Sequence, residues 1–351
     1  MNTSPASSTP VRFAIAGLTH GHVDWWFRRP KRDNGDMQLV GIAEANADLV
    51  ARYSAKYAIA PSLFYADLGA LIDAVQPAAV MAFGSTFDHL RVVQTCAPRG
   101  VPVMVEKPLA VNSDHAAQIA ALSRQHRIPV LTNYETTWYA SNHEAYRLVH
   151  DEGMIGDVRK MVVHDGHWGP AEIGCPPEFL GWLTDPVLNG GGVIMDFGCY
   201  GTNLMTWLMD GMAPLSVTAI TQQIKPHIYP NVDDEATILL SYPHAQGIIQ
   251  ASWNWPWHRK DMEVYGATGM VTAVNRTTLH IRDGLNGEER TQTLPPRATP
   301  YDDVFAYFAA VVRGDVVPPA DDLSGLDNNV MVVRILDAAR ESARLGRAIS
   351  L

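Results

Sequence analysis

Short apolar runs alternate with helix-like segments from residue 11 to about residue 132. The apolar runs lie at 11–18, 37–44, 78–83, 101–108 and 128–133. Parallel strands need a long crossover, usually a helix, so this alternation favours a parallel sheet covered by helices on both faces. Ligands of such sheets bind at the carboxyl ends of the strands. We therefore predict a doubly wound α/β domain over residues 11–132.

Beyond about Asn133 the apolar residues take the period of two that is typical of half-buried strands. The segments with this pattern are 158–168, 213–224, 235–242, 247–255 and 261–266. Short turns between them favour an antiparallel or mixed sheet. We expect helices near 142–152, 196–209 and 327–345, and the last could pack back on the first domain. Residues 133–351 are thus predicted to form a substrate-binding and oligomerisation domain of the α+β class, with a large, mostly antiparallel sheet.

The chain is acidic and carries few charged residues. Its 351 residues include 27 Lys and Arg against 37 Asp and Glu, a formal charge of −10, and charged residues make up 18%. An acidic chain offers no basic field to phosphate backbones or anionic lipid, so we expect neither nucleic acid nor a membrane as partner. Because soluble domains usually contain roughly 25% charged residues, we expect surface to be buried between copies, in a homodimer or homotetramer.

Features at the level of the whole chain predict a soluble protein of the cytoplasm. The segment MNTSPASSTP at 1–10 lacks the charged and apolar regions of a signal peptide, and we interpret it as a disordered leader. Every apolar run is far shorter than the roughly 20 residues that cross a bilayer. The three cysteines, Cys96, Cys175 and Cys199, are far apart and odd in number, which fits no disulfide framework.

The first predicted strand runs into a turn where a dinucleotide-binding unit has its glycines. The turn meets the G-x-G-x-x-G pattern only in part, because Thr19 and His22 stand where the second and third glycines would be. An ordinary strand-to-helix turn would look the same. The residues of this turn that we expect to contact a cofactor are Gly17, Thr19, His20, Gly21 and His22.

Glu44 closes the second predicted strand, 22 residues after His22. An acid about 20 residues past the glycine turn bonds the ribose hydroxyls of NAD. Its carboxylate would repel a 2′-phosphate, and no Arg or Lys follows until Arg52. The pattern favours NAD over NADP, although a solvated strand end would also suit Glu44.

Lys107 lies in Glu106-Lys107-Pro108, at the end of a buried strand where a nicotinamide would sit. Desolvation disfavours an ammonium ion, so we expect the pKa of Lys107 to fall and the side chain to exchange protons near neutral pH. A surface strand end is the alternative. Further predicted cofactor contacts are Gly84, Ser85, His89, Glu106, Lys107 and Asn133.

A second informative segment reads GGGVIMDFGCYGTN over residues 190–203. On one helix, Asp196, Tyr200 and Asn203 would fall at i, i+4 and i+7 and share a face. Such a face can bind and deprotonate a hydroxyl group. Alternatively, Asp196 caps the helix and Tyr200 packs in the core.

Together these motifs resemble the glucose-fructose oxidoreductase/inositol dehydrogenase family, called Gfo/Idh/MocA. The resemblance covers nearly the whole chain and implies a Rossmann domain and hydride transfer between a nicotinamide cofactor and a carbinol of a sugar, polyol or related compound. It implies that Lys107 is the lysine of the E-K-P motif and Asp196 the aspartate of D-x-G-x-H/Y. Tyr200 stands where the inositol dehydrogenase branch has histidine, as in the tyrosine branch, where it exchanges the substrate proton. The glycine turn departs from the family pattern.

These residues suggest a mechanism. Tyr200, with its pKa lowered by the Lys107 ammonium, takes the hydroxyl proton, and Asp196 orients the substrate or Lys107. We expect the substrate contacts to be Glu135, His167, Trp168, Asn203 and His258. A carboxylate at Glu135 argues against an acidic substrate. His164 and His167 are three positions apart on a predicted strand and therefore point to opposite faces, so no metal site is expected.

Two other functions fit the same residues. With permanently bound NAD, transient oxidation would give a redox-neutral glycoside hydrolase or epimerase, and NADH would not accumulate. A sensor would bind the dinucleotide without catalysis, but it has no need of Lys107, Asp196 and Tyr200 together. An NAD(P)-dependent sugar or polyol dehydrogenase is the preferred interpretation.

Overall fold

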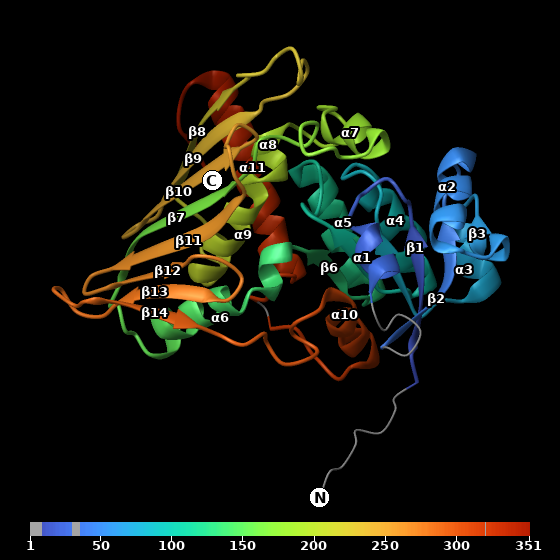
Figure 1. The fold of residues 1–351 in the computed structure, drawn as a ribbon, viewed down its shortest axis with the longest axis horizontal. Helices are drawn as coiled ribbons and strands as arrows, with labels where there is room; N and C mark the ends of the chain where they lie inside the picture. Colours follow the sequence, from blue (N-terminus) through green and yellow to red (C-terminus); the bar gives the residue numbers. More distant parts are fainter. Residues whose placement is uncertain (1–8, 30–35, 320) are drawn as a thin grey trace, which may run out of the picture.

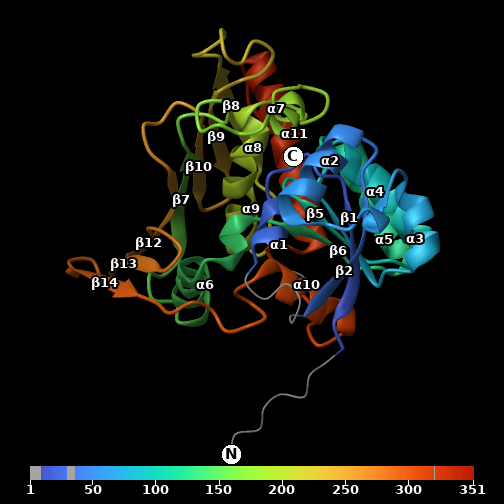
Figure 2. The ribbon, with the colours of Figure 1, turned by 45° about the vertical axis from the view of Figure 1, so that its right-hand side comes forward.

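Two sheets stand side by side with helices between them in the computed structural model (Figure 1). The structure describes residues 9–29, 36–319 and 321–351, so the predicted leader lies almost wholly outside the described residues. None of the helices in these ranges is both long and apolar enough to span a membrane. The view in Figure 2, turned by 45°, shows the same two layers with α9 and α11 between them.

The first sheet confirms the predicted doubly wound fold. Its order is β3-β2-β1-β4-β5-β6, with every neighbouring pair parallel. All residues of β4, β5 and β6 are buried, as expected for strands that helices cover on both faces. The strands are β1 (Val11–Ala16), β2 (Met37–Ala43), β3 (Phe64–Tyr65), β4 (Ala79–Ala82), β5 (Val103–Glu106) and β6 (Val130–Asn133).

The helices of this half begin and end at local signals. For α5, the Asn112 side chain accepts a hydrogen bond from the His115 N–H at 2.8 Å, and Arg127 ends the helix in the left-handed conformation. The helices are α1 (Val23–Arg28), α2 (Ala47–Tyr57), α3 (Leu68–Val75), α4 (Asp88–Cys96) and α5 (Ser113–His126), with 3-10 turns at Pro61–Leu63, Ala97–Arg99 and Glu135–Trp138.

The second sheet is mostly antiparallel, as predicted. Its order is β14-β13-β12-β11-β7-β10-β9-β8-β15, and within the described residues only β7 and β10 pair in parallel. The strands are β7 (Val158–Gly166), β8 (Ser216–Gln222), β9 (Glu235–Ser241), β10 (Gln246–Ser252), β11 (Arg259–Gly266), β12 (Met270–Ala273), β13 (Thr278–Arg282), β14 (Glu289–Thr293) and β15 (Ile349–Ser350).

Helices cover one face of this sheet. Those that contact its strands are α6 (Ala140–Tyr146), which continues into a π turn at Arg147–Asp151, α8 (Val193–Asp196), α9 (Gly198–Leu208) and α11 (Leu326–Leu345). The other helices of this half of the chain are α7 (Pro177–Leu183) and α10 (Val304–Arg313). Both α9 and α11 pack on the strands, and α11 also contacts α5. In contrast, α10 packs into the core beneath β1.

The predicted helix over 196–209 is wrong in one respect, because it is two helices that break at Phe197. The Asp233 carboxylate accepts the N–H groups of Gly192 and Ile194 at 2.9 and 2.7 Å and so fixes the start of α8. A Cβ on Gly192 would lie 1.9 Å from the Asp233 carbonyl oxygen. The glycine run is therefore needed for a close approach of two distant segments, and Asp196 and Tyr200 come from separate helices.

Candidate active site

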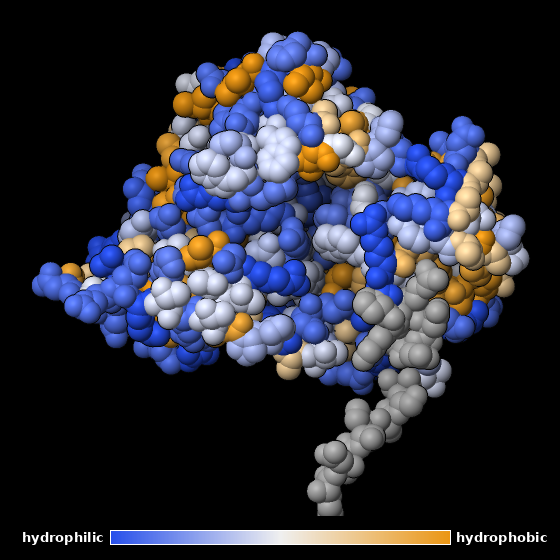
Figure 3. Space-filling model, viewed as in Figure 1, coloured by the Kyte–Doolittle hydropathy of each residue, from blue (hydrophilic) through white to orange (hydrophobic). Residues whose placement is uncertain are grey.

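A cavity of about 690 Å³ opens between the two halves of the molecule, where the space-filling view is hollowed (Figure 3). One end is lined by the turn after β1, through His20 and His22. The other end is lined by residues of the second half, among them Tyr200 and Lys260. The cavity thus lies at the carboxyl edge of the parallel sheet, where ligands of doubly wound folds bind.

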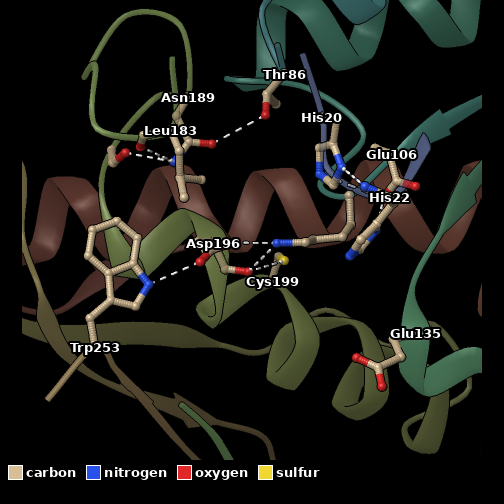
Figure 4. Close-up of polar contacts among 12 residues, drawn as sticks. His20, His22, Thr86, Glu106, Glu135, Leu183, Asn189, Asp196, Cys199 and Trp253 are labelled. Atoms are coloured by element: carbon tan, nitrogen blue, oxygen red, sulfur yellow. Dashed lines mark hydrogen bonds and ion pairs between the residues drawn. The ribbon is translucent and has the colours of Figure 1, made fainter. Parts of the chain in front are cut away.

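Lys107 and Asp196 meet at the floor of this cavity. The Lys107 Nζ forms an ion pair with the Asp196 carboxylate and donates to the Asp196 carbonyl oxygen at 3.0 Å. Trp253 Nε1 donates to the other carboxylate oxygen at 3.0 Å, so the aspartate is held from both sides (Figure 4). Asp196 therefore braces Lys107, and it does not cap α9.

The expected fall in the pKa of Lys107 is wrong. Burial lowers the pKa, but the adjacent Asp196 carboxylate outweighs burial, and the pKa of Lys107 lies above its ordinary value. The same ion pair lowers the pKa of Asp196 against the effect of burial. Both groups are charged at neutral pH, and Lys107 is a fixed cation.

Tyr200 is buried beside two cations. Its ring centroid lies 4.3 Å from Lys260 Nζ and 5.2 Å from Lys107 Nζ. Burial raises the pKa of Tyr200 well above its ordinary value, and the charges of Asp165 and Glu135 raise it further. The expected lowering of this pKa is therefore wrong, because burial and the acidic groups outweigh the nearby Lys107 ammonium, and the resting side chain is a neutral phenol.

Lys260 is a site residue that the sequence analysis missed. Its Nζ pairs with Glu135 Oε2 at 2.7 Å, while Glu135 Oε1 accepts the Tyr139 hydroxyl at 2.9 Å. Burial raises the pKa of Glu135, but Lys260 and the Tyr139 hydroxyl bring it down to about 2. No local pattern joins Lys260 to Glu135, since they are 125 positions apart.

Asp165 stands opposite Lys260 in the pairing of β7 with β11. It is 1% exposed, and neither carboxylate oxygen has a hydrogen-bond partner in the described part of the chain. Burial raises its pKa well above the ordinary value. The Lys260 ammonium therefore has Glu135 and the Tyr200 ring among its partners but no hydrogen bond to Asp165.

The turn after β1 is shaped for a close backbone approach. Gly17 has φ +84°, and a Cβ there would lie 3.0 Å from the backbone of Gly84. A second cavity of about 250 Å³ lies over this turn, with Gly17, Thr19, Glu44, Gly84 and His89 in its wall. The Glu44 carboxylate accepts the N–H groups of Leu18 and Asn46 at 3.0 and 2.9 Å, which fixes its position. The site fits a dinucleotide.

Glu106 supports the end of the larger cavity that is lined by the turn after β1. It accepts hydrogen bonds from His22 at 3.0 Å and from Asn133 at 2.9 Å. Burial raises the pKa of Glu106, but the two histidines and Asn133 bring it to about 2. Asn133 and Glu106 therefore support the turn from behind, and neither lines the cavity.

His20, His22 and Glu106 have the spacing of metal ligands. However, His20 Nδ1 accepts the His22 N–H at 3.2 Å. In the neutral ring the proton is then on Nε2, and burial keeps the ring neutral by lowering the pKa of His20 well below its ordinary value. A protonated Nε2 is not a metal ligand, and it lies 3.9 Å from Glu106 Oε2 without a hydrogen-bond partner in the described part of the chain.

The predicted substrate contacts divide into two groups. His167 and His258 line the larger cavity with Glu135, and Trp168 lies at its edge, 4.9 Å from the His258 ring. Asn203 lies elsewhere: it is fully buried, and its Nδ2 donates to the Leu323 carbonyl at 2.8 Å. Asn203 shares α9 with Tyr200, but it does not line the cavity, so its prediction as a substrate contact is not supported by its position.

The remaining predicted cofactor contacts are Gly84, Ser85 and His89, which lie in or beside the wall of the second cavity, and Gly21. Gly84 and His89 line it, whereas the Ser85 hydroxyl donates to Asp88 at 2.7 Å in the following turn. His89 Nδ1 pairs with the Leu109 carbonyl at 3.2 Å. Gly21 lines the larger cavity.

Comparison with known proteins finds a matching family for each half of the chain. Residues 11–134 match the oxidoreductase family with an NAD-binding Rossmann fold, and residues 143–272 match the GFO/IDH/MocA C-terminal domain. A D-xylose 1-dehydrogenase [NADP(+)] of Haloarcula marismortui is 25% identical over 338 residues, 92% of this chain and 89% of that protein. A trans-1,2-dihydrobenzene-1,2-diol dehydrogenase of Xenopus laevis is 25% identical over 260 residues, 72% and 74% of the two chains.

A solved structure shares the whole fold. The inositol dehydrogenase homolog from Azotobacter vinelandii, complexed with NAD+, superposes with a TM-score of 0.84 at 18% identity and covers 100% of both chains.

Proposed function

The chain belongs to the Gfo/Idh/MocA family of NAD(P)-dependent oxidoreductases, and from that premise we propose that it transfers hydride between NAD and a carbinol of a neutral sugar or polyol. One observation carries the proposal: Tyr200 lies beside two lysines in a cavity that reaches the glycine turn. Bound NAD would supply a nicotinamide that accepts hydride from a carbinol or returns it to a ketone. Gly17, Thr19, Glu44 and Gly84 would hold it.

Tyr200 is the group we propose to exchange the substrate proton. As a neutral phenol it is ready to donate to a ketone oxygen, and it must first release its proton to water in the cavity to accept one from a carbinol. Lys107 and Lys260 favour the phenolate over the phenol, because both cations lie over the ring. Asp196 keeps Lys107 in place.

The charges of the cavity favour an uncharged substrate. Lys107 is paired with Asp196, and Lys260 with Glu135. An acidic substrate would have to break one of these pairs and leave a buried carboxylate without its partner. Sugar hydroxyls can bond to the paired groups without displacing them.

Three contacts favour NAD over NADP. Glu44 presents its carboxylate to the second cavity, where it would repel a 2′-phosphate. Arg52 forms an ion pair with Glu178, and Arg91 pairs with Asp88 at 3.0 Å. Arg52 does not line the second cavity, and Arg91, which does, has Asp88 as its partner there.

We also propose that the chain forms a homodimer or homotetramer through the outer face of the second sheet. Ile220 on β8 is 67% exposed and Leu239 on β9 is 38% exposed on this face. Hydrophobic residues, drawn in orange, are visible in Figure 3 along the upper left side of the molecule, where Figure 1 labels β8 and β9. Burying such side chains between copies is a usual reason for oligomers. Light scattering after size exclusion gives the stoichiometry, and Ile220→Asp should lower it.

A reducing compartment, the cytoplasm, is the proposed location. Cys96, Cys175 and Cys199 are all free thiols, and two of them are buried. Disulfides are rare where thiols are kept reduced.

The test is a scan of the purified protein with NAD and NADP against monosaccharides, polyols and inositols at 340 nm. We expect reduced cofactor to accumulate with NAD and at least one of these compounds. Silence with both cofactors, while calorimetry shows NAD binding, would contradict a dehydrogenase and point to redox-neutral chemistry or a sensor.

A further inference from the structure

The two walls of the active-site cavity differ in chemistry. One wall is polar and carries Lys107, Asp196, Tyr200, Lys260 and His167. The other wall comes from the segment 169–183 and is mainly apolar, with Pro170, Ile173, Pro176, Phe179 and Leu183 lining the cavity. The hydroxyl groups of a sugar find hydrogen-bonding partners on the polar wall and none among the side chains of these five residues.

The inner part of the apolar wall belongs to the cofactor end. Phe179 packs edge-on against His20 with ring centroids 5.0 Å apart, and Trp182 lies 5.5 Å from the same ring. Cys175 lies close enough to Asp196 and Lys107 for their charges to act on its thiol. The other part of the apolar wall is the outer one, around Pro170 and Ile173.

The outer part is exposed and carries large apolar side chains. Ile173 is 37% exposed, and Trp257, which lines the same cavity from the loop before β11, is 63% exposed. Trp168 is 38% exposed beside His258. Apolar side chains that gather at the mouth of a cavity mark a binding surface.

This wall is also held in place. Lys225 Nζ donates to the carbonyl oxygens of Trp168 at 2.8 Å and Trp253 at 2.7 Å, and it forms an ion pair with Glu172. Farther along, Asn189 accepts the Thr86 hydroxyl of the first half at 3.2 Å (Figure 4). The apolar surface is therefore preformed, which lowers the entropy cost of binding.

From these walls we propose that the substrate is a neutral glycoside with an apolar aglycone. The sugar ring meets the polar wall at Tyr200, and the aglycone lies on Ile173 and Trp257 at the mouth. The cavity, at about 690 Å³, lies within the range that holds drug-sized ligands. This inference rests on the proposed function and specifies its substrate class.

The test compares phenyl and methyl glycosides of the same sugar, over glucosides, galactosides, mannosides and xylosides. For the sugar that is oxidised, we expect kcat/KM to be about tenfold or more higher for the phenyl glycoside, as burial of an aromatic ring implies. Ile173→Ser and Trp257→Ser should each lower this ratio, mainly through KM. Val187→Ser is the matched control, because Val187 is 63% exposed in the neighbouring loop and does not line the cavity.

Equal kcat/KM for phenyl and methyl glycosides would overturn the proposal, as would a ratio that neither substitution changes. Calorimetry with NAD-loaded protein and the same pairs separates the two proposals. Tighter binding of the phenyl glycosides without any oxidation would contradict the proposed function and keep the apolar subsite. Equal binding of both glycosides would exclude the subsite.

Discussion

Lys107 and Lys260 approach the ring of Tyr200 from the two halves of the molecule and are held differently. Lys107 ends a parallel strand, and its partner Asp196 is fixed by Trp253, so carboxylate and ammonium are both buried. Lys260 begins an antiparallel strand and pairs with Glu135, whose side chain is 32% exposed. The first pair is a rigid part of the floor, and the second borders the open cavity. We therefore expect the Lys107–Asp196 pair to be essential for the reaction and the Lys260–Glu135 pair to have a smaller effect on its rate.

The largest expected effect comes from breaking the rigid pair. Lys107→Met should lower kcat by about 10²- to 10⁴-fold, because Tyr200 loses a fixed cation and the substrate loses a donor. It also leaves Asp196 buried without its partner, at a cost of about 3–5 kcal/mol in the free energy of unfolding. Thermal unfolding and steady-state kinetics measure both.

The double substitution Lys107→Met with Asp196→Asn separates the two effects. Without a buried unpaired charge, the double variant should regain much of the lost stability while its kcat stays low. If its activity returned with its stability, Lys107 would have only a structural role.

Tyr200→Phe removes the group between the two lysines. We expect kcat to fall by about 10²-fold with little change in the Kd of NAD, because the hydroxyl contributes to proton transfer and not to cofactor binding. In the wild type, carbinol oxidation needs the phenolate, and the pKa of Tyr200 is raised above its ordinary value. The oxidation rate should therefore keep rising with pH up to at least pH 10, and Tyr200→Phe should lose this dependence. A loss of NAD binding with normal turnover of the bound cofactor would contradict this role.

Lys260→Met tests the more exposed pair. We expect a fall in kcat of about tenfold, since one cation over the ring is lost while Lys107 remains. The pH at which oxidation reaches half its maximum should move upward. Arg259→Met is a suitable control, because Arg259 also lines the cavity but pairs with Asp261 and lies 6.0 Å from the Trp255 ring. An equal effect of both substitutions would indicate a general charge effect.

The smallest effect concerns stability in acid. Glu135 has its pKa lowered to about 2 in the folded chain, so its stabilisation is complete above the ordinary carboxyl pKa and disappears as pH falls through about 2. The wild type should exceed Glu135→Gln in stability at pH 6, and the difference should shrink as pH falls from 5 toward 2. Chemical unfolding at several pH values measures it. A difference that stays constant with pH would mean that the Lys260–Glu135 charges contribute nothing.

Local patterns predicted where the residues of the first half of the site lie in the fold, while their roles stay predictions. The turn after β1, Glu44 and Lys107 follow strands whose positions the apolar runs indicated, and a parallel sheet places strand ends at one edge. The expected direction of the shift in the Lys107 pKa was wrong because Lys107 follows β5, whereas its partner Asp196 is on α8, 89 positions away. The buried strand before Lys107 indicated that burial would lower its pKa. Nothing near Lys107 in the sequence indicated that the Asp196 carboxylate would raise it.

The second half of the site depends on contacts between distant strands. Lys260 faces Tyr200 only because β11 pairs with β7 in one particular register, and that register was not visible in the sequence. The break between α8 and α9 depends on Asp233, which lies in a loop before β9. A local signal was available for α10: Asp303 caps the helix and Gly314 ends it, around an apolar run that the sequence analysis did not use.

The most direct test of the account is a single-turnover experiment with NAD-loaded protein and a sugar that carries deuterium on the reacting carbon. Absorbance at 340 nm is followed after rapid mixing, for the wild type and for Tyr200→Phe. The account predicts that the band of the reduced cofactor appears in the wild type, that deuterium slows it, and that Tyr200→Phe slows it further while NAD stays bound. A protein that binds NAD and the sugar but forms no such band, with or without deuterium, would contradict hydride transfer at this site.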